Sequence, residues 1–244
     1  MLSITTHKFL FFSKKEIWFY DNNETTEDAD YTVFCYCTER LQTAFDQYLP
    51  EQSAFIDLKT ETAELFTKMH RTYKYQIQKA KRLGITFRMD QSPSVEECKI
   101  FLSDFNQFAN AKGFPVAKSK RIFALQRSGN IIFTHALRNN EILATHAYIH
   151  DGKTALLLHT FHRARHNSSY GRGIANKFLH WQDILFFKQK GFETYDLGGI
   201  NFETVPGITR FKLGLGAQPY EVHNYVRVKN WLRPMFHILK KVRT

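Results

Sequence analysis

The order of two apolar periodicities limits the folds open to this chain more than any other feature. After Gly84, stretches in which every second residue is apolar, as in strands, exchange with stretches in which apolar residues recur every three or four positions, as in helices. This order predicts an α/β fold with a mixed sheet and helices on both faces. The predicted strands are 85–89, 131–137, 142–149, 154–161, 192–197 and 220–228, and the predicted helices are 95–111, 118–128, 171–189 and 206–213.

Short turn signals connect the three central strands. Asn139 and Asn140 separate the first two strands, and Asp151 with Gly152 separates the second from the third. Asn, Asp and Gly tolerate the positive φ angles that two-residue hairpin turns need. The strands between residues 131 and 161 are therefore expected to form an antiparallel meander.

The first 60 residues predict a β-rich N-terminal section. Apolar runs at 8–12, 16–20, 31–38 and 54–58 have the length of strands. We expect antiparallel pairing, with a turn at residues 13–15 and an exposed acidic loop at 21–30. The next segment, residues 61–84, is predicted to be a basic connecting helix. The helix runs from about residue 60 to residue 83, and Gly84 ends it.

Charge is distributed unevenly along the 244 residues. The part up to Leu65 has 5 basic and 12 acidic residues, and the part from Phe66 onward has 29 and 11, so the two carry −7 and +18. The larger part is expected to meet an anion, which leaves a cofactor phosphate, nucleic acid, a nucleotide-linked substrate and an acidic membrane face open. Residues 229–244 predict a basic amphipathic helix that either lies on an anionic surface or docks on the domain.

Several classes of protein are excluded by composition. The 43% of hydrophobic residues support a packed core, which argues against wholesale disorder. No apolar run approaches the roughly 18 residues of a spanning helix, and the N-terminus lacks a signal-peptide pattern. Three cysteines do not suggest a disulfide framework. We expect a cytoplasmic protein, with the C-terminal helix as a route to peripheral contact with the inner membrane face.

Three segments carry a resemblance to a known family. Residues 195–200 read Tyr-Asp-Leu-Gly-Gly-Ile, residues 210–216 read Arg-Phe-Lys-Leu-Gly-Leu-Gly, and residues 75–85 form a basic segment that ends in Leu-Gly-Ile. This pattern resembles the FemAB-like branch of the GNAT acyl-CoA N-acyltransferase superfamily. The resemblance spans about residues 65–228. It implies a GNAT-like catalytic domain at 85–228 and, in residues 1–60, a reduced partner domain.

The loop before the helix at 171–189 is the predicted cofactor site. A glycine-containing loop at a helix N-terminus presents backbone N–H groups and a positive dipole end to phosphate. The resemblance adds an oxyanion-binding backbone N–H near Phe161. The superfamily usually has Arg or Gln three residues before the first loop glycine, where this chain has Ser168 or Tyr170. The predicted cofactor-binding residues are Phe161, Arg165, Ser168, Ser169, Tyr170, Gly171, Arg172, Gly173, Ile174 and Ala175.

Three side chains are predicted to be catalytic. Asp196 ends a strand beside two glycines, where it would hold the acceptor amine or act as a base, or else cap the following loop. Lys212 matches the FemAB-like lysine and would bind phosphate or stabilise developing charge, unless it is an ordinary surface lysine. His159, near a strand end, is a second candidate base. No metal site is predicted, because strand residues four apart, as His146 and His150 are, lie about 13 Å from each other.

The resemblance therefore implies an enzyme that transfers an acyl group from acyl-CoA to the amine of a small-molecule or nucleotide-linked acceptor, by direct attack. One alternative is a FemAB-like transferase that uses aminoacyl-tRNA and acts on a peptidoglycan-type precursor. Another alternative, from a different class, is a non-catalytic protein that binds nucleic acid or a membrane surface. The sequence leaves the donor open between acyl-CoA and aminoacyl-tRNA.

Overall fold

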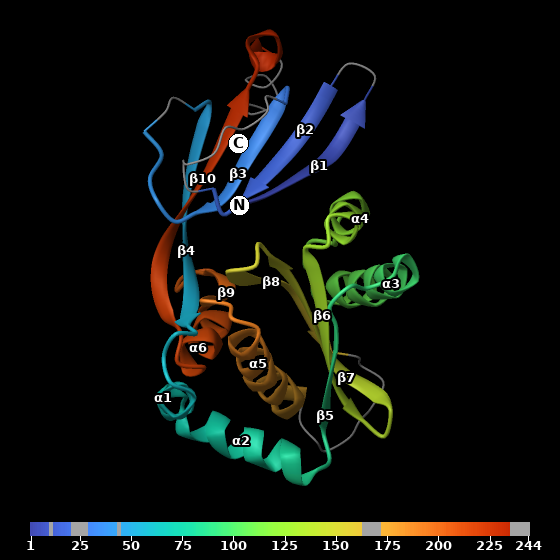
Figure 1. Cartoon of the computed structure of the whole chain (residues 1–244), viewed down its shortest axis with the longest axis vertical. Coiled ribbons are helices and arrows are strands. Elements are labelled where there is room, and N and C mark those ends of the chain that lie inside the picture. The colour runs from blue at the N-terminus through green and yellow to red at the C-terminus, as the bar shows by residue number, and fades with distance from the viewer. Residues whose placement is uncertain (10–11, 21–28, 43–44, 163–171, 235–244) are drawn as a thin grey trace. The chain divides into compact units, whose positions relative to one another are not determined.

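The computed structural model describes residues 1–9, 12–20, 29–42, 45–162 and 172–234. The chain forms two compact units, one made of Met1–Gln52 with Glu221–Thr244 and one made of Ser53–Tyr220 (Figure 1). Strands β4 (Gln47–Asp57) and β10 (Gln218–Val228) contribute residues to both units. Each unit is described by itself.

The first unit is a β-sheet with a small aromatic core. Its strand order is β1-β2-β3-β10-β4, with β1 at Leu2–Phe9, β2 at Phe12–Trp18 and β3 at Tyr31–Cys37. Ile17, Phe34 and Tyr225 are buried in its core. The short 3₁₀ helix η1 (Asn230–Leu232) follows β10. The β-rich character of the N-terminal section is as the sequence predicted.

The pairing inside this sheet differs from the prediction. β1 and β2 are antiparallel, but β2 and β3 are parallel, in register from Lys14↔Tyr31 to Trp18↔Cys35. The predicted turn at 13–15 is wrong, because these residues lie within β2. The backbone N–H and the Oγ of Ser13 both donate to Asp30 Oδ2 at 2.8 Å, which holds the start of β2 beside the start of β3. Apolar alternation does not encode strand direction, so the sequence pattern could not distinguish the two arrangements.

The second unit contains the mixed sheet that the sequence predicted. Its strand order is β4-β9-β8-β7-β6-β5. The strands from β5 to β8 are antiparallel to their neighbours, whereas β8 and β9 are parallel. Asn139 and Asn140 have φ of 50° and 63°, so they form the expected hairpin turn. The strands are β5 (Thr86–Asp90), β6 (Ile131–Arg138), β7 (Glu141–His150), β8 (Thr154–His162) and β9 (Thr194–Ile200).

Helices cover both faces of this sheet, and the strand alternation shows which face each covers. Ile132 and Tyr148 belong to the core cluster that includes Trp181 of α5 (Arg172–Gln189). Helix α2 (Arg71–Arg82) packs against α5. Phe133, the next residue of β6, instead stacks on Phe101 of α3 with ring centroids 4.6 Å apart. α3 spans Val95–Lys112, begins with a capping box between Ser94 and Glu97, and contacts α4 (Ser119–Arg127).

The predicted connecting helix is two helices, so the single-helix prediction is wrong. α1 (Thr62–Lys68) ends at Met69, and α2 begins after His70; both intervening residues have extended backbones with ψ of 146° and 138°. The N–H of His70 donates to Gly214 O at 2.9 Å, and its Nδ1 accepts from Thr72 N. Met69 is still buried in the core. The helical spacing of apolar residues therefore continues across the break and hides it.

Two sequence predictions remain partly outside the described residues. Residues 235–244 hold most of the predicted C-terminal helix, and residues 163–171 hold most of the predicted cofactor loop. Within the described part of the chain, no helix has the length and apolar character needed to cross a membrane.

The contact between α2 and α6 (Pro206–Gly214) gives a prediction about stability. A Cβ at Gly214 would lie 2.7–2.9 Å from the Tyr73 ring, whereas a Cβ at Gly207 would meet nothing within 4 Å. Gly214→Ala should lower the free energy of unfolding by about 1–3 kcal/mol through overpacking. Gly207→Ala, the matched control on the same helix, should leave the free energy of unfolding unchanged or raise it. Urea unfolding of both variants checks this, and equal midpoints would contradict the close approach.

Candidate active site

Strands β8 and β9 separate shortly after they begin to pair. Their register covers only Thr154↔Thr194, Ala155↔Tyr195 and Leu156↔Asp196. β8 nevertheless continues to His162, and β9 continues to Ile200. Beyond Leu156 and Asp196 the two strands therefore lose their mutual backbone hydrogen bonds, which makes this the place where an extended ligand can pair with strand backbone.

Side chains bind the backbone of β9 beyond the paired stretch. The N–H of Gly198 donates to Asp196 Oδ1 at 2.7 Å. Lys212 of α6 donates from Nζ to the carbonyl oxygens of Gly198 at 3.0 Å and Gly199 at 2.6 Å. Asp196 and Lys212, two of the predicted catalytic residues, thus lie at the same strand end, where both hold its backbone in place.

The Asp196 carboxylate is completely buried and has several donors. Oδ1 also accepts from Ser53 Oγ at 2.6 Å, and Oδ2 accepts from the Tyr220 hydroxyl. Burial raises the pKa of Asp196, and the hydrogen bonds from Ser53 and Tyr220 partly offset this rise. Of the three roles considered for Asp196, this geometry favours the cap, in which the carboxylate fixes the following backbone rather than contacting an acceptor.

Lys212 is half-buried, unlike an ordinary surface lysine. Burial lowers its pKa to about 8, and the nearby Asp196 charge opposes this shift. Among the described residues, the carbonyl oxygens of Gly198 and Gly199 accept two of the three N–H groups of Lys212. The third N–H group is left for a ligand. The ammonium group is thereby oriented at the end of β9, and it has no ion pair with any residue in the described part of the chain.

His159 and Phe161 lie on the opposite face of the sheet from α5. The His159 ring packs on Phe105 of α3, with centroids 4.3 Å apart, and Phe161 is buried against the same helix. Burial, with a smaller contribution from Arg121, lowers the pKa of His159 to about 4. The described contacts do not bring His159 to Asp196 or Lys212, so the three predicted catalytic side chains do not form one group.

The described part of the predicted cofactor segment is the first turn of α5. The side chains of Ile174 and Ala175 are buried in a core cluster, so only their backbone N–H groups can meet a ligand. Gly173 O accepts from Lys177 Nζ at 3.3 Å. Arg165, Ser168, Ser169, Tyr170 and Gly171 lie outside the described residues, as does the side chain of Arg172.

Lys177 is a candidate that sequence reasoning missed. Its Nζ lies 4.6 Å from the centroid of the Tyr73 ring and 5.5 Å from that of Phe211. Burial lowers its pKa. Lys177 follows Gly173 by four residues, about one turn of α5. This spacing was the sequence signal that could have identified Lys177 as a cation near the N-terminus of the helix.

A hydrogen-bonded network fills the space between α5 and strands β7 and β9. The Tyr148 hydroxyl donates to Asp183 Oδ2 at 2.7 Å, and its oxygen lies 2.7 Å from the Tyr195 hydroxyl. The Tyr195 hydroxyl in turn lies 2.7 Å from His180 Nδ1. Since Tyr148 gives its hydrogen to Asp183, Tyr195 donates to Tyr148 and His180 donates to Tyr195. All hydrogen bonds of this chain therefore point toward the buried Asp183 carboxylate.

His146 completes the network from the other side. Its Nδ1 faces Asp183 Oδ2 at 2.7 Å, and its Nε2 faces Asn176 Oδ1 at 2.8 Å. Each ring nitrogen of His146 therefore has a hydrogen-bond partner on α5, which holds the imidazole ring in one orientation. The sequence signal was the polar stripe that Asn176, His180 and Asp183 form at spacings of four and three on an otherwise apolar helix.

The same residues offer the ligand types of a metal site. One donor atom each of His146, His180 and Asp183 lies within 4.8 Å of the others. A metal would need lone pairs on ring nitrogens, whereas Nδ1 of both histidines has a hydrogen-bond partner here, and Asp183 Oδ1 has none among the described residues.

The family follows from a sequence comparison. A profile of the acetyltransferase (GNAT) domain matches residues 67–221, which is more than half of the chain. The chain belongs to this family. No curated protein sequence matches the chain.

Solved structures share the fold of this GNAT protein at low sequence identity. FemX has a TM-score of 0.60 and 12% identity over 77% of this chain and 63% of its own. The C-terminal domain of a putative lysylphosphatidylglycerol synthetase from Agrobacterium fabrum has a TM-score of 0.57 and 15% identity, over 80% and 67%. L-PGS from Bacillus licheniformis has a TM-score of 0.54 and 15% identity, over 85% of this chain and 71% of its own. These likenesses agree with the FemAB-like branch, and the chain spans less than two thirds of FemX.

The buried network in this GNAT domain gives a second prediction. Tyr195→Phe removes the hydroxyl that partners both His180 and Tyr148, and a buried polar group left unpaired costs about 1–3 kcal/mol. The free energy of unfolding should fall by that amount. Tyr75→Phe, at a tyrosine that is 60% exposed, is the matched control and should change little. Equal unfolding midpoints for the two variants would show that the network contributes no stability.

Proposed function

We propose that this chain transfers an acyl group from acyl-CoA to the amino group of an acceptor. The observation that carries the proposal is the separation of β8 and β9 after Leu156 and Asp196, followed along the chain by the N-terminus of α5. The pantetheine arm of coenzyme A contains amides that can pair with the freed strand backbone, and its phosphates suit the N–H groups of a helix N-terminus.

The reaction needs little covalent chemistry from the protein. The amine attacks the thioester carbonyl, the new C–N bond forms, the C–S bond breaks, and the proton lost by the amine ends on the thiolate. Lys212 is a candidate to stabilise negative charge during this step, because its half-buried ammonium group is fixed at the strand end. In this proposal Asp196 acts as a positioning residue that holds Gly198.

Aminoacyl-tRNA is the second candidate donor. The solved structures with TM-scores above 0.5 include the C-terminal domain of a putative lysylphosphatidylglycerol synthetase, whose name states that a lysyl group is joined to phosphatidylglycerol. The residues Arg71, Lys81 and Arg82 are exposed on α2, where they suit a polyanion. Under this alternative the acceptor is an amine of a peptidoglycan-type precursor, or a similar group, and tRNA is a partner.

Calorimetric titration with acetyl-CoA distinguishes the donors. Saturable binding near micromolar, about −8 kcal/mol, supports acyl-CoA. The control ligand is tRNA, charged and uncharged. Binding and turnover only with charged tRNA would replace acyl-CoA by aminoacyl-tRNA as the donor, and binding of tRNA without turnover would favour the non-catalytic alternative.

Lys212 gives a prediction about rate and pH. Lys212→Met should lower kcat/KM about 10²-fold or more, because a preorganised donor is removed. Protonated lysine stabilises negative charge, so the wild-type rate should fall as pH rises through about 8, where Lys212 loses its proton. That decline should be absent in Lys212→Met.

Arg210→Met, at an exposed position of the same helix, is the control for Lys212→Met and should keep both the rate and the pH profile. Urea unfolding of both variants separates loss of activity from loss of fold. A rate that is unchanged in Lys212→Met would remove this residue from the mechanism.

A further inference from the structure

The Lys212 amine has a hydrogen-bond geometry whose meaning changes with its protonation state. Its Nζ lies 3.0 Å from Gly198 O and 2.6 Å from Gly199 O. A protonated lysine has three N–H groups, whereas a neutral one has two N–H groups and a lone pair. In the neutral form the two carbonyls accept both hydrogens, so the lone pair takes the position that is left for a ligand. Neutral Lys212 is therefore an oriented nucleophile at the end of β9.

The groups around Lys212 leave part of the amine neutral near pH 8. Burial lowers the pKa of Lys212 to about 8, and the Asp196 carboxylate of β9 opposes this shift. On α5, burial holds the pKa of His180 well below its usual value, with smaller contributions from nearby basic groups that include Lys212 and Lys177. On α2, burial raises the pKa of Tyr73. His180 and Tyr73 are therefore neutral at this pH, and the charged groups on the elements packed around α6 are Asp196 and Lys177.

The end of β9 is also where the proposed function brings an acyl group. β8 and β9 pair only as far as Leu156↔Asp196, and the pantetheine arm of the donor is proposed to use the strand backbone beyond that pair. Lys212 holds the carbonyls of this same stretch of β9. A thioester bound there lies beside an amine whose lone pair is already oriented, which favours attack through proximity.

We propose that a bound acyl donor acylates Lys212 on Nζ when no acceptor amine is present. The neutral amine attacks the thioester carbonyl, the C–N bond forms and the C–S bond breaks. The proton lost by the nitrogen ends on the thiolate, so the products are an N-acyl-lysine and a free thiol. The amide nitrogen keeps one hydrogen and no charge, so it cannot bind both carbonyls or stabilise negative charge. Self-acylation thereby removes the cation that the proposed function uses, and it rests on that function for its donor.

Lys177 of α5 is a matched comparison within the same protein. Burial lowers its pKa as well. Its Nζ lies 4.6 Å from the ring centroid of Tyr73 and 5.5 Å from that of Phe211, and these rings favour the charged form. Among the described residues its one carbonyl acceptor is Gly173 O, at 3.3 Å. Lys177 therefore shares burial with Lys212 but lacks the pair of acceptors that would orient a lone pair.

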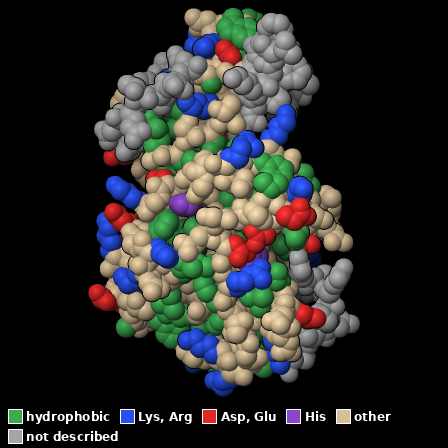
Figure 2. Space-filling model, turned by 45° about the vertical axis from the view of Figure 1, so that its right-hand side comes forward, with side chains coloured by type: hydrophobic (Ala, Val, Ile, Leu, Met, Phe, Trp, Pro, Cys, Tyr) green, Lys and Arg blue, Asp and Glu red, His purple; other side chains and the backbone are tan. Residues whose placement is uncertain are grey.

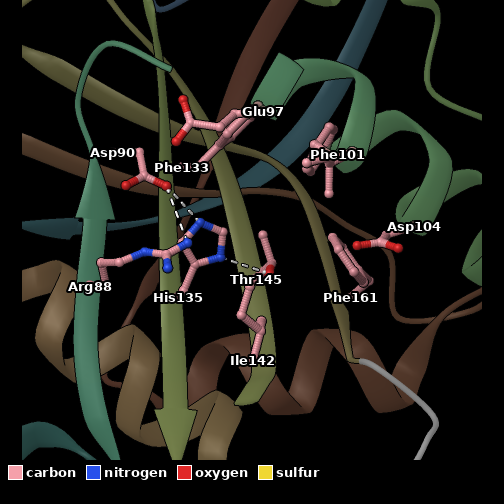
Figure 3. A pocket seen from close by; sticks show the side chains of 11 residues that line it. Arg88, Asp90, Glu97, Phe101, Asp104, Phe133, His135, Ile142, Thr145 and Phe161 are labelled. Carbon is pink, nitrogen blue, oxygen red and sulfur yellow. Dashed lines mark hydrogen bonds and ion pairs between the residues drawn. The ribbon is translucent and has the colours of Figure 1, made fainter. Parts of the chain in front are cut away.

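A pocket of about 240 Å³ on the α3 face of the sheet bears on the choice of probe (Figure 3). Phe101 and Phe133 line it with rings stacked 4.6 Å apart, so an aromatic ester is expected to enter it. Its charged groups are engaged with one another, since His135 Nε2 and Arg88 approach Asp90 Oδ2 at 3.0 and 3.6 Å. No lysine is among the described residues that line this pocket. An ester bound there therefore produces no acyl-lysine.

The test is acetylation of the full chain by p-nitrophenyl acetate, which needs no coenzyme site, and in parallel by acetyl-CoA without an acceptor amine. Peptide mass spectrometry measures the rate at each lysine. Lys and Arg side chains are spread over the visible face in Figure 2, and the exposed Lys81 supplies the background rate. At pH 8 the ester should acetylate Lys212 about tenfold faster than Lys81, because half of the Lys212 amine is neutral whereas the reference pKa of lysine is about 10.4.

The pH profile and Lys177 separate orientation from burial. The rate at Lys212 should rise up to about pH 8 and level off above it, opposite to the decline expected for transfer to an acceptor. Lys177 should be acetylated more slowly than Lys212. Equal rates at Lys177 and Lys212, or a rate at Lys212 no higher than at Lys81, would overturn the proposal. Lys212→Arg should lose the label at this position and keep the label at Lys81, which verifies the peptide assignment.

Calorimetric titration with acetyl-CoA, run beside the labelling, distinguishes this proposal from the proposed function. Saturable binding together with acetylation of Lys212 supports both. Binding of acetyl-CoA that leaves Lys212 unmodified would overturn self-acylation and leave the donor in place. Absence of binding would overturn acyl-CoA as the donor, and labelling by the ester would then still support or overturn the reactive amine.

Discussion

The early end of pairing between β8 and β9 is the constraint on which the functional part of this protein depends. Two strands that separate leave backbone donors and acceptors that must find other partners, and an unpaired buried group costs about 1–3 kcal/mol. On the β9 side, Asp196 takes the Gly198 N–H, and Lys212 takes the carbonyls of Gly198 and Gly199. Side chains thus replace ladder hydrogen bonds and keep the strand end in a fixed shape. Two of the residues that the sequence indicated as catalytic therefore also bind the backbone of β9 where its pairing with β8 has ended.

The sequence predicts the second unit well because its signals are local. The hairpin turn at Asn139 and Asn140, the capping box at Ser94 and the helical spacing on α5 all depend on residues close in the chain. The errors occur where a distant contact decides the geometry. His70 breaks the connecting helix through its hydrogen bond to Gly214, and Ser13 lies within a strand through its bonds to Asp30. Nothing within a few residues of either position indicates these partners.

The site shows the same division between local and distant information. The sequence indicated Asp196 at a strand end and Lys212 by its match to the FemAB-like lysine, but the partners that bury the Asp196 carboxylate are Ser53, 143 residues earlier, and Tyr220. Burial with three donors changes what this carboxylate can do, since it has no exposed surface to offer an amine. The buried Asp183 carboxylate likewise has a partner on a distant strand, because His146 Nδ1 of β7 lies 2.7 Å from Asp183 Oδ2. Residue type indicates a chemical group, while its role depends on which distant elements surround it.

The two faces of the second sheet differ in the charged side chains that they present, and this difference bears on the charge of the ligand that each face suits. Lys177 and Lys212 bring cations to the side of α5 and α6, where an anionic donor would enter. Asp90, Glu97 and Asp104 bring carboxylates to the side of α3. Because adjacent residues of a strand point to opposite faces, β8 can separate the two environments within a single residue step, from Thr160 to Phe161. Among the described residues, the lysines that lie near strand ends are thus separated by the sheet from these carboxylates, and an anionic ligand is favoured on the side of α5 and α6.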